Sequence, residues 1–423
     1  MALSNNKYFG RIQKLRKSKD GKTLLKNFSY LSILEMTVHL FPLITTPYLA
    51  RVIGVDGFGI LAIGIATVAY FQSFTNYGFI YTSVRDAARC REDIEKFSKV
   101  VCTTLYSKTI LMLVSYGLIA LGTIIIPFFR DNSAVIWCTA LLLPGHVFNP
   151  DWIFQALEDM KYITVRNLLS KTLFTLLIFV FIRQPEDYLW QPVLTALGML
   201  VPSVWGIIVL KKRFGLKLII PSLKEVYHNI ANGFNMFITV FLPTVYTNLN
   251  VLLLSSFNGK SATGLYSGGT KFTHIAYSLF QLLSRTFFPF FARKMSAHKM
   301  YVIFSLGLSF IISITLFLFA RPIVLLFLGE DFEGTVDVLR IVAFTPIAMS
   351  LMNSYGVNYL VLKGKENLMR NIIVFIAIIG IFFGALGAIY YSYIGVAFAS
   401  LTTQFMRAGL ITYYAHKINK SDN

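Results

Sequence analysis

Apolar runs long enough to cross a bilayer recur along almost the whole chain, and this feature constrains its fold most strongly. A transmembrane helix needs about 20 consecutive apolar residues, and in lipid only helices and closed barrels satisfy all their backbone hydrogen bonds. The runs occupy residues 27–49, 59–83, 102–127, 134–156, 164–182, 189–210, 229–254, 262–284, 301–328, 337–360, 371–391 and 394–414. We therefore predict an all-α integral membrane protein with about twelve transmembrane helices joined by short connections.

The composition excludes the main soluble classes of protein. Charged residues make up 14% of the 423 residues and the mean hydropathy is +0.63. Soluble proteins carry about 25% charged residues, and disordered chains have low hydrophobicity. Enzyme motifs are absent, because the Gly-Lys-Ser run at 259–261 has leucine at position 254, where a Walker A loop needs glycine. Cys90, Cys102 and Cys138 have no metal-binding or disulfide spacing. We expect no catalytic residue, cofactor or metal.

Basic residues are distributed unevenly along the chain. The 39 Lys+Arg exceed the 20 Asp+Glu, which gives a net charge of +19. Nucleic-acid binders carry such charge on soluble domains, and no run of this chain is long and polar enough to form one. If the N-terminus is cytoplasmic, 30 of the 39 bases fall in segments on that side, and the outer loops hold only Arg51, Arg130, Arg183 and Lys260. The positive-inside rule therefore predicts that both termini are cytoplasmic.

The chain begins with a basic segment that does not look like a cleavable signal peptide. Eight Lys/Arg lie in the first 26 residues, and no small-residue cleavage site follows the first apolar run. We expect that run to be retained as the first span. The predicted organisation is a cytoplasmic N-terminus (1–26), an N-terminal lobe (27–210), a cytoplasmic linker (211–228), a C-terminal lobe (229–414) and a cytoplasmic tail (415–423).

The two halves share residues at a nearly constant offset, which indicates a duplication. Three glycines recur 205 residues later, and four polar residues recur 204 residues later: Gly54, Gly59 and Gly64 as Gly259, Gly264 and Gly269, and Asn149, Lys161, Arg166 and Asn167 as Asn353, Lys365, Arg370 and Asn371. Six spans per half is an even number, so both halves enter the membrane from the same side. We predict two six-helix lobes related by a parallel pseudo-two-fold repeat, with a central cavity between them.

Polar residues follow one face of several spans that the repeat relates. In the first span, Ser32, Glu35, His39, Pro42 and Thr46 are three or four residues apart and share a helical face. Such stripes are costly in lipid unless they face a cavity or one another. The predicted substrate path holds Glu35, His39, Gln72, Asn76, Asn235, Asn250, Lys271 and His274. The alternative for the amides is hydrogen bonding between helices, and for the histidines it is packing.

Depth in the membrane separates the charged candidates. Glu35 lies about 13 Å along the helix from Lys26, too deep for a short acid to reach the headgroups, so function is favoured over a structural ion pair. Lys271 lies about nine residues from either flank of its span, and a cavity role is favoured there too. Lys108 and Lys171 lie within about two turns of the cytoplasmic end, where snorkelling explains them equally well.

Four further charged residues are candidate gates or anchors. Asp151 follows the Asn149-Pro150 helix break, where a helix cap and a gating group are equally plausible. Arg166 and Arg370 are predicted to occupy equivalent places at the cytoplasmic starts of spans five and eleven, with anchoring favoured over gating. Arg51 lies in the first outer loop.

Two stretches resemble a known family. The run PYLARVIGVDGFG at 47–59 resembles the first outer loop of bacterial O-antigen flippases, and DWIFQALE with the following Lys, Tyr and Arg-Asn at 151–167 resembles their segment after span four. These flippases form the polysaccharide-transport branch of the multidrug/oligosaccharidyl-lipid/polysaccharide exporter superfamily. One departure is Ala156, where the family usually has glycine.

The resemblance implies a carrier that moves an undecaprenyl-pyrophosphate-linked repeat unit from the cytoplasmic to the periplasmic leaflet of the bacterial inner membrane by alternating access. A coupling ion (proton or sodium), a polysaccharide polymerase and a chain-length regulator are further candidate partners; nucleic acid is not. Three alternatives remain: a multidrug or small-solute antiporter of the same fold, a major-facilitator sugar carrier, and a non-transporting scaffold for polysaccharide assembly. The lysines suit pyrophosphate better than cationic drugs, and 84–101 lacks the glycines of a major-facilitator loop.

Overall fold

The computed structural model describes residues 19–293 and 298–421, and in that part of the chain all regular structure is helical. Side chains are described from residue 41 onward, apart from 285–293 and a few single positions. The α-helices are α2 (Lys19–Asn76), α3 (Phe79–Arg89), α4 (Ile94–Ile125), α5 (Pro127–Asp131), α6 (Ser133–Ala140), α7 (Leu142–Val147), α8 (Asp151–Ala156), α9 (Met160–Phe181), α10 (Trp190–Arg213), α11 (Leu223–Arg293), α12 (His298–Leu318), α13 (Ala320–Phe327), α14 (Thr335–Val342), α15 (Thr345–Leu351) and α16 (Glu366–Ser421). Two 3₁₀ turns, η1 (Pro185–Leu189) and η3 (Glu330–Phe332), and the π-helix η4 (Met352–Val361) complete the set. The expected all-α class is confirmed.

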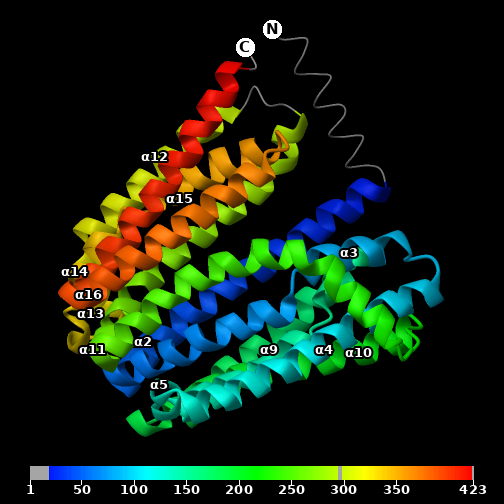
Figure 1. Cartoon of the computed structure of the whole chain (residues 1–423), viewed down its shortest axis with the longest axis horizontal. Helices are drawn as coiled ribbons and strands as arrows, with labels where there is room; N and C mark the ends of the chain where they lie inside the picture. The colour runs from blue at the N-terminus through cyan, green and yellow to red at the C-terminus, as the bar shows by residue number, and fades with distance from the viewer. Residues whose placement is uncertain (1–18, 294–297, 422–423) are drawn as a thin grey trace.

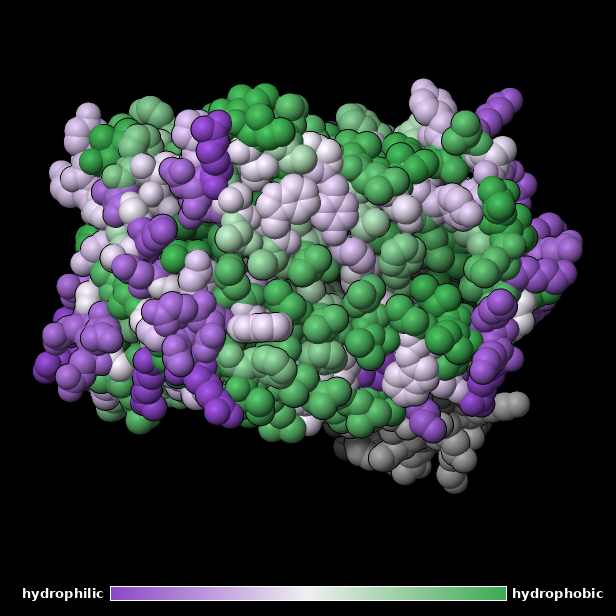
Figure 2. Space-filling model, turned by 90° about the horizontal axis from the view of Figure 1, so that it is seen from below, coloured by the Kyte–Doolittle hydropathy of each residue, from purple (hydrophilic) through white to green (hydrophobic). Residues whose placement is uncertain are grey.

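The helices form two groups in sequence order. Figure 1 shows the helices of the first half, blue to green, on one side and those of the second half, yellow to red, on the other. Helices α2 and α11 run side by side between the groups, and the Tyr70 hydroxyl donates a hydrogen bond to the Val245 carbonyl oxygen at 3.1 Å. On the face shown in Figure 2, hydrophobic residues cover the middle and hydrophilic ones gather toward the two ends, as a bilayer-spanning surface requires.

Three helices are too long for a single crossing and each contains a break. Helices α2 and α11 break at Gly54 (φ 66°) and Gly259 (φ 82°), where glycine permits a left-handed backbone. Helix α16 breaks at Ser392 (φ 53°). Seven described helices, or eight with one bent pair, are apolar and long enough to span a membrane. Dividing the three long helices and pairing the short ones gives about twelve crossings at about 20 residues each. Twelve remains our interpretation of the helix order.

The broken ends of α2 and α11 meet through a pair of reciprocal backbone contacts. A Cβ atom added at Gly59 would lie 2.0 Å from the Lys260 carbonyl oxygen, and one added at Gly264 would lie 2.1 Å from the Val55 carbonyl oxygen. The two contacts are equivalent in the repeat, because an offset of 205 residues relates Gly59 to Gly264 and Val55 to Lys260. A two-fold axis between the halves would produce this exchange, so the geometry supports the predicted repeat.

Alanine at this contact is expected to force the halves apart. Gly264→Ala places a methyl group against the Val55 carbonyl. A backbone atom cannot move aside as the end of a flexible side chain can, so the two helices must separate. We expect faster labelling of a cysteine at Ser261, beside the contact, by a membrane-impermeant maleimide added outside the cell. Gly307→Ala is the matched control, because nothing lies within 4 Å of its added Cβ. Equal labelling in the two backgrounds would contradict the contact.

Several connections differ from the sequence-based expectation. The cytoplasmic loop expected at 84–101 contains the end of α3 and the start of α4, whose first turn is capped by Asp93. The run at 134–156 is divided at Phe148–Pro150, because proline lacks the amide hydrogen that a continuous helix needs. The run at 337–360 is divided into α14, α15 and η4. π-Helical segments are rare and are often found at functional sites.

Candidate functional site

A polar cavity of about 480 Å³ lies where the two halves meet. The second arm of α2 contributes three apolar residues, and all the remaining lining residues come from the second half of the chain. The polar lining residues are Thr247, Asn248, Asn250, Tyr266, Ser267, Thr270, Lys271, Thr273, His274, Tyr277, Thr345, Ser400, Thr403 and Gln404. Hydroxyls and amides at the centre of a membrane protein indicate a wet cavity, because lipid would leave them unsatisfied.

Lys271 reaches from the second half of the chain to the first. Its ammonium group donates a hydrogen bond to Thr46 Oγ1 at 3.3 Å and lies 4.5 Å from the centre of the Phe58 ring. Both partners are neutral, and no side chain with a described position forms an ion pair with Lys271. Lys271 is half-buried, and a hydroxyl and an aromatic face offset only part of the cost of its ammonium group, so the group can bind an anion.

A second cavity of about 330 Å³ lies on the other side of Lys271. Pro42, Leu43 and Thr46 of α2 line it together with Lys271, Phe272, His274, Ile275, Ser278 and Phe327. This cavity is less polar than the first: five of its nine lining residues are apolar, whereas fourteen of the twenty-one around the first are polar. Lys271 and His274 line both, so a cation stands at the boundary between a polar and an apolar space.

Unpaired buried oxygens support a hydrated or ligand-filled polar cavity. Ser267 Oγ and Gln404 Oε1 are buried with no hydrogen-bond partner in the described part of the structure. A buried polar atom without a partner costs about 1–3 kcal/mol, which water or ligand hydroxyls would recover. Asn250 is also buried and packs against Gly384, where an added Cβ would lie 2.1 Å from Asn250 Oδ1.

The predicted path residues therefore separate into three groups. Asn250, Lys271 and His274 come together at the cavity. Asn76 lies outside the cavity, and its Oδ1 accepts a hydrogen bond from Lys108 Nζ at 3.4 Å. Gln72 is half-buried and lines none of the described cavities. Glu35, His39 and Asn235 lie outside the residues whose side chains are described.

Of the two lysines expected near the cytoplasmic end, Lys108 is buried, with 4% of its surface exposed. Its partner Asn76 ends α2, so the lysine joins α4 to the end of α2 within the first half. This position differs from the lipid-facing one that snorkelling requires. Lys171 is half-buried and lines a different cavity.

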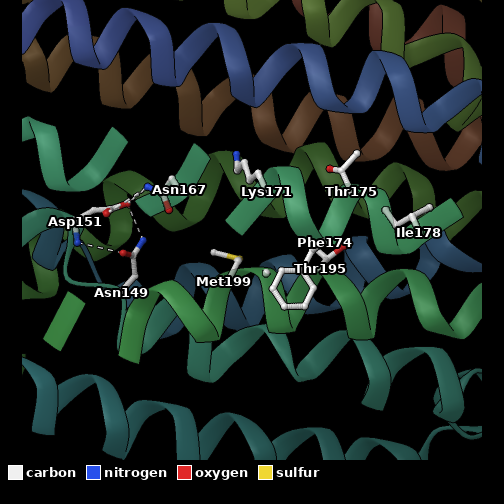
Figure 3. Close-up of a pocket in the computed structure, with 10 residues that line it drawn as sticks. Asn149, Asp151, Asn167, Lys171, Phe174, Thr175, Ile178, Thr195 and Met199 are labelled. Atoms are coloured by element: carbon white, nitrogen blue, oxygen red, sulfur yellow. Dashed lines mark hydrogen bonds between the residues drawn. The ribbon is translucent and has the colours of Figure 1, made fainter. Parts of the chain in front are cut away.

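That cavity, of about 360 Å³, lies within the first half of the chain. The residues that line it come from the ends of α7 and α8 and from α9 and α10: Asn149, Asp151, Asn167, Lys171, Phe174, Thr175, Ile178, Thr195, Gly198 and Met199 (Figure 3). Figure 3 shows Asn149, Asp151 and Asn167 joined by hydrogen bonds at one end, with Lys171 further along the same helix as Asn167.

Asp151 is the centre of a half-buried cluster that surrounds the buried Arg166. Its carboxylate pairs with the Arg166 guanidinium and accepts hydrogen bonds from Asn149 Nδ2 at 3.0 Å and Asn167 Nδ2 at 3.2 Å. Arg166 also donates to Asn149 Oδ1 at 3.0 Å and is only 3% exposed. Its Nη1 packs against Gly206, where an added Cβ would lie 2.1 Å away. The cluster ties the helix break after α7 to α9 and α10.

The repeat-related arginine has a different environment. Arg370 is exposed near the start of α16, and no described residue forms an ion pair with it. An offset of 204 residues places Tyr355 where Asp151 stands in the first half, which accounts for the missing partner. Arg51, at the opposite end, donates a hydrogen bond to the Leu326 carbonyl oxygen at 2.6 Å and so joins the two halves.

The sequence analysis did not single out Phe58, which contacts Lys271, or several polar lining residues, of which Gln404 is one. Phe58 carries no polar signal, and only the fold brings its ring to Lys271. Gln404 lies in the run at 394–414 directly after Thr402 and Thr403, and the search for polar residues inside spans that found Asn250 could also have found it.

Comparison with known proteins identifies the family. Residues 24–295, well over half of the chain, match the family model described as polysaccharide biosynthesis protein. The chain belongs to this polysaccharide biosynthesis protein family. The "Putative O-antigen transporter" of Escherichia coli (strain K12) is 23% identical over 400 residues, 93% of this chain and 96% of that protein. The protein of the same name from Shigella dysenteriae is 24% identical over 388 residues, 90% and 97% of the two chains.

Solved transporters share the fold of this family member. The lipid II flippase MurJ in an inward closed conformation superposes with a TM-score of 0.73 at 13% identity, covering 92% of this chain and 87% of that one. An inward-facing multidrug resistance MATE transporter gives 0.70 at 14% identity, with 93% and 98% covered. An outward-facing MATE structure gives 0.62 at 13% identity, with 97% and 98% covered. The relatives named above are described as transporters, and these structural likenesses show that the chain has a transporter fold.

Proposed function

We propose that the protein flips a lipid-linked polysaccharide repeat unit from the cytoplasmic to the periplasmic leaflet of a bacterial inner membrane. The observation that carries the proposal is Lys271, a cation with no described acid partner at the boundary of a polar and an apolar cavity between the halves. A headgroup with a pyrophosphate and sugars cannot cross hydrocarbon unaided, because each buried charge must be compensated.

The chemistry of the two cavities matches the two parts of such a substrate. Lys271 supplies a point charge for the pyrophosphate. The hydroxyls and amides of the polar cavity suit sugar hydroxyls, which both donate and accept hydrogen bonds. The apolar cavity beside Pro42 and Phe327 suits the first isoprene units, while the remaining lipid tail stays in the bilayer.

The contacts between the halves support alternating access with this conformation closed at one end. Gly59 and Gly264, Arg51 with Leu326, and the hydrogen bond from Ser261 Oγ to Asp56 close the end that the base count places outside. The inward-facing MATE structure superposes better than the outward-facing one, which is consistent with that assignment. Rocking of the halves about this contact would then expose the cavity to the other side.

A multidrug antiporter of the same fold is the second candidate, because MATE transporters share the architecture. Lys271 disfavours it, since a cation at the cavity repels cationic drugs. A coupling proton or sodium ion, and association with a polymerase or chain-length regulator, belong to the proposal as further partners.

Deletion of the gene tests the function. We expect surface polysaccharide to disappear and the lipid-linked repeat unit to accumulate in the cytoplasmic leaflet, where a membrane-impermeant probe added outside spheroplasts does not reach it. Accumulation in the periplasmic leaflet would instead place the protein after translocation, as an assembly scaffold.

The topology has its own test. A periplasm-active reporter inserted at Glu330-Asp331, in η3 at the closed end, is expected to be active, because the base count places this end outside. A reporter at Lys365, in the turn before α16, is expected to be inactive. The reverse pattern would overturn both the orientation and the proposed direction of transport.

A further inference from the structure

The connection between the two halves is bound along the start of α4. Between α10 and α11 the chain is extended: Lys217 N donates to Ser98 Oγ at 3.0 Å, and Ile219 N donates to Cys102 Sγ at 3.3 Å. Leu216, just before, is buried at 3% exposure. The inter-lobe connection therefore has a defined position on the first half of the molecule.

Ion pairs hold the connection at both ends. Lys217 Nζ lies 3.3 Å from Glu95 Oε1, and Lys99 pairs with Glu225. Lys99 and then hydrogen bonds from Ser222 lower the pKa of Glu225 to about 2, so this carboxylate is charged at every physiological pH. The backbone bonds to Ser98 and Cys102, together with the buried Leu216, set which side chains of the connection face α4, and these exposed ion pairs add little to that.

The side chains that face away are large and apolar. Leu218 is 66% exposed, Ile220 82%, Leu223 81% and Tyr227 74%. Leu218 and Ile220 alternate with their neighbours in the extended part, and Leu223 and Tyr227 continue the series in the first two turns of α11. These four side chains form a hydrophobic edge, and exposing such an edge to water is unfavourable.

Unpaired bases flank this apolar edge. Lys211 and Lys212 at the end of α10, and Lys224 at the start of α11, are exposed, and no described acid pairs with them. Arg213 is held over the Tyr162 ring at 5.4 Å. Apolar side chains flanked by bases are typical of segments that lie in the interface of an anionic membrane.

The connection lies at the level of the membrane boundary. On α10, Trp205 and Ile208 are exposed apolar residues and the bases begin at Lys211, one turn later. On α4, Tyr106 is exposed one turn beyond Cys102, which is about 6 Å along the helix. Aromatic residues mark the headgroup level, so the connection lies within about one turn of it.

We propose that residues 211–227 form a binding site for acidic phospholipid of the cytoplasmic leaflet. Lys211, Lys212 and Lys224 bind the phosphate groups, and Leu218, Ile220, Leu223 and Tyr227 insert at the boundary between headgroups and acyl chains. This site differs in position from the cavity of the proposed function and does not depend on it. It gives the connection between the two halves a defined place on the membrane surface.

Native mass spectrometry of the purified full-length protein tests the headgroup contact, with phosphatidylglycerol and phosphatidylcholine as probes. We expect the triple variant Lys211→Gln/Lys212→Gln/Lys224→Gln to bind phosphatidylglycerol at least about fivefold more weakly, and phosphatidylcholine unchanged. The matched control is Lys299→Gln/Lys365→Gln/Lys417→Gln, three exposed lysines of the second half. If both triple variants lose phosphatidylglycerol binding equally, the effect is one of net charge and the proposed site is wrong.

Fluorescence quenching tests the apolar contact in vesicles that contain phosphatidylglycerol. A tryptophan at Ile220 is expected to be quenched by lipids brominated near the headgroup end of the chain and little by acrylamide, after subtraction of the wild-type signal. Glu92→Trp, in the exposed loop before α4, should show the opposite pattern. If acrylamide quenches Ile220→Trp as strongly as Glu92→Trp, the edge faces water or a soluble partner and the proposal is wrong.

Discussion

Replacing Lys271 by alanine is expected to abolish surface polysaccharide while the protein still reaches the membrane in normal amount. Among the residues whose side chains are described, its ammonium group contacts Thr46 Oγ1 and the Phe58 ring, so its removal leaves no described acid unpaired. Loss of one partner of a buried charge contact costs about 2–5 kcal/mol in binding, or about 30-fold or more at 1.4 kcal/mol per tenfold.

Two further variants separate charge from structure at this position. Lys271→Arg should keep much of the export, because a flexible phosphate needs charge more than one geometry, and Lys271→Glu should lose it by repulsion. Lys299→Ala, at an exposed lysine far along the chain, is the control. Normal export by Lys271→Ala would place the headgroup site elsewhere. Disappearance of all three variants from the membrane would show that the lysine is structural.

The largest effect on stability is expected at Asp151. Asp151→Ala leaves the Arg166 guanidinium buried without its counter-ion and leaves Asn149 and Asn167 each without an acceptor. Breaking a buried pair in this way costs about 3–5 kcal/mol, which lowers Tm on the order of 10 °C in purified protein. The double variant Asp151→Asn/Arg166→Met should recover part of the loss, because it removes both charges together.

The second half supplies the control for this experiment. Arg370→Ala changes the repeat-related arginine, which is exposed and has no described ion-pair partner. We expect it to change the free energy of unfolding by no more than about 0.5 kcal/mol, as surface substitutions do, and therefore to leave Tm nearly unchanged. A gating role for Asp151 would appear differently, as lost export with an unchanged Tm. That outcome would contradict the anchoring role.

The features that follow a local rule could be predicted from the sequence. Apolar runs predicted the helices, and the glycine pairs at Gly54 and Gly259 correspond to the two helix breaks. Depth along a span was enough to single out Lys271, which the structure places at the cavity. These inferences need only a helical period and a length.

The contacts between distant segments could not be predicted. Thr46 and Lys271 are 225 positions apart, and their contact depends on how α2 and α11 rotate and pack. The ion pair between Asp151 and Arg166 depends on a helix break whose direction proline alone does not determine. Sequence spacing indicates which residues share a helical face, but only packing decides which other helix contacts that face.

Purified protein in proteoliposomes gives the most direct test of translocation. Vesicles carry an undecaprenyl-pyrophosphate-linked oligosaccharide in both leaflets, and a glycan-modifying enzyme added outside reacts only with the outer leaflet. With wild-type protein the account predicts that the fraction modified rises from about one half toward completion, because flipping exposes the inner pool. With Lys271→Ala it should remain near one half, as in protein-free vesicles. Equal flipping by wild type and Lys271→Ala would contradict the headgroup site, and absence of flipping by the wild type in the presence of both proton and sodium gradients would contradict the flippase itself.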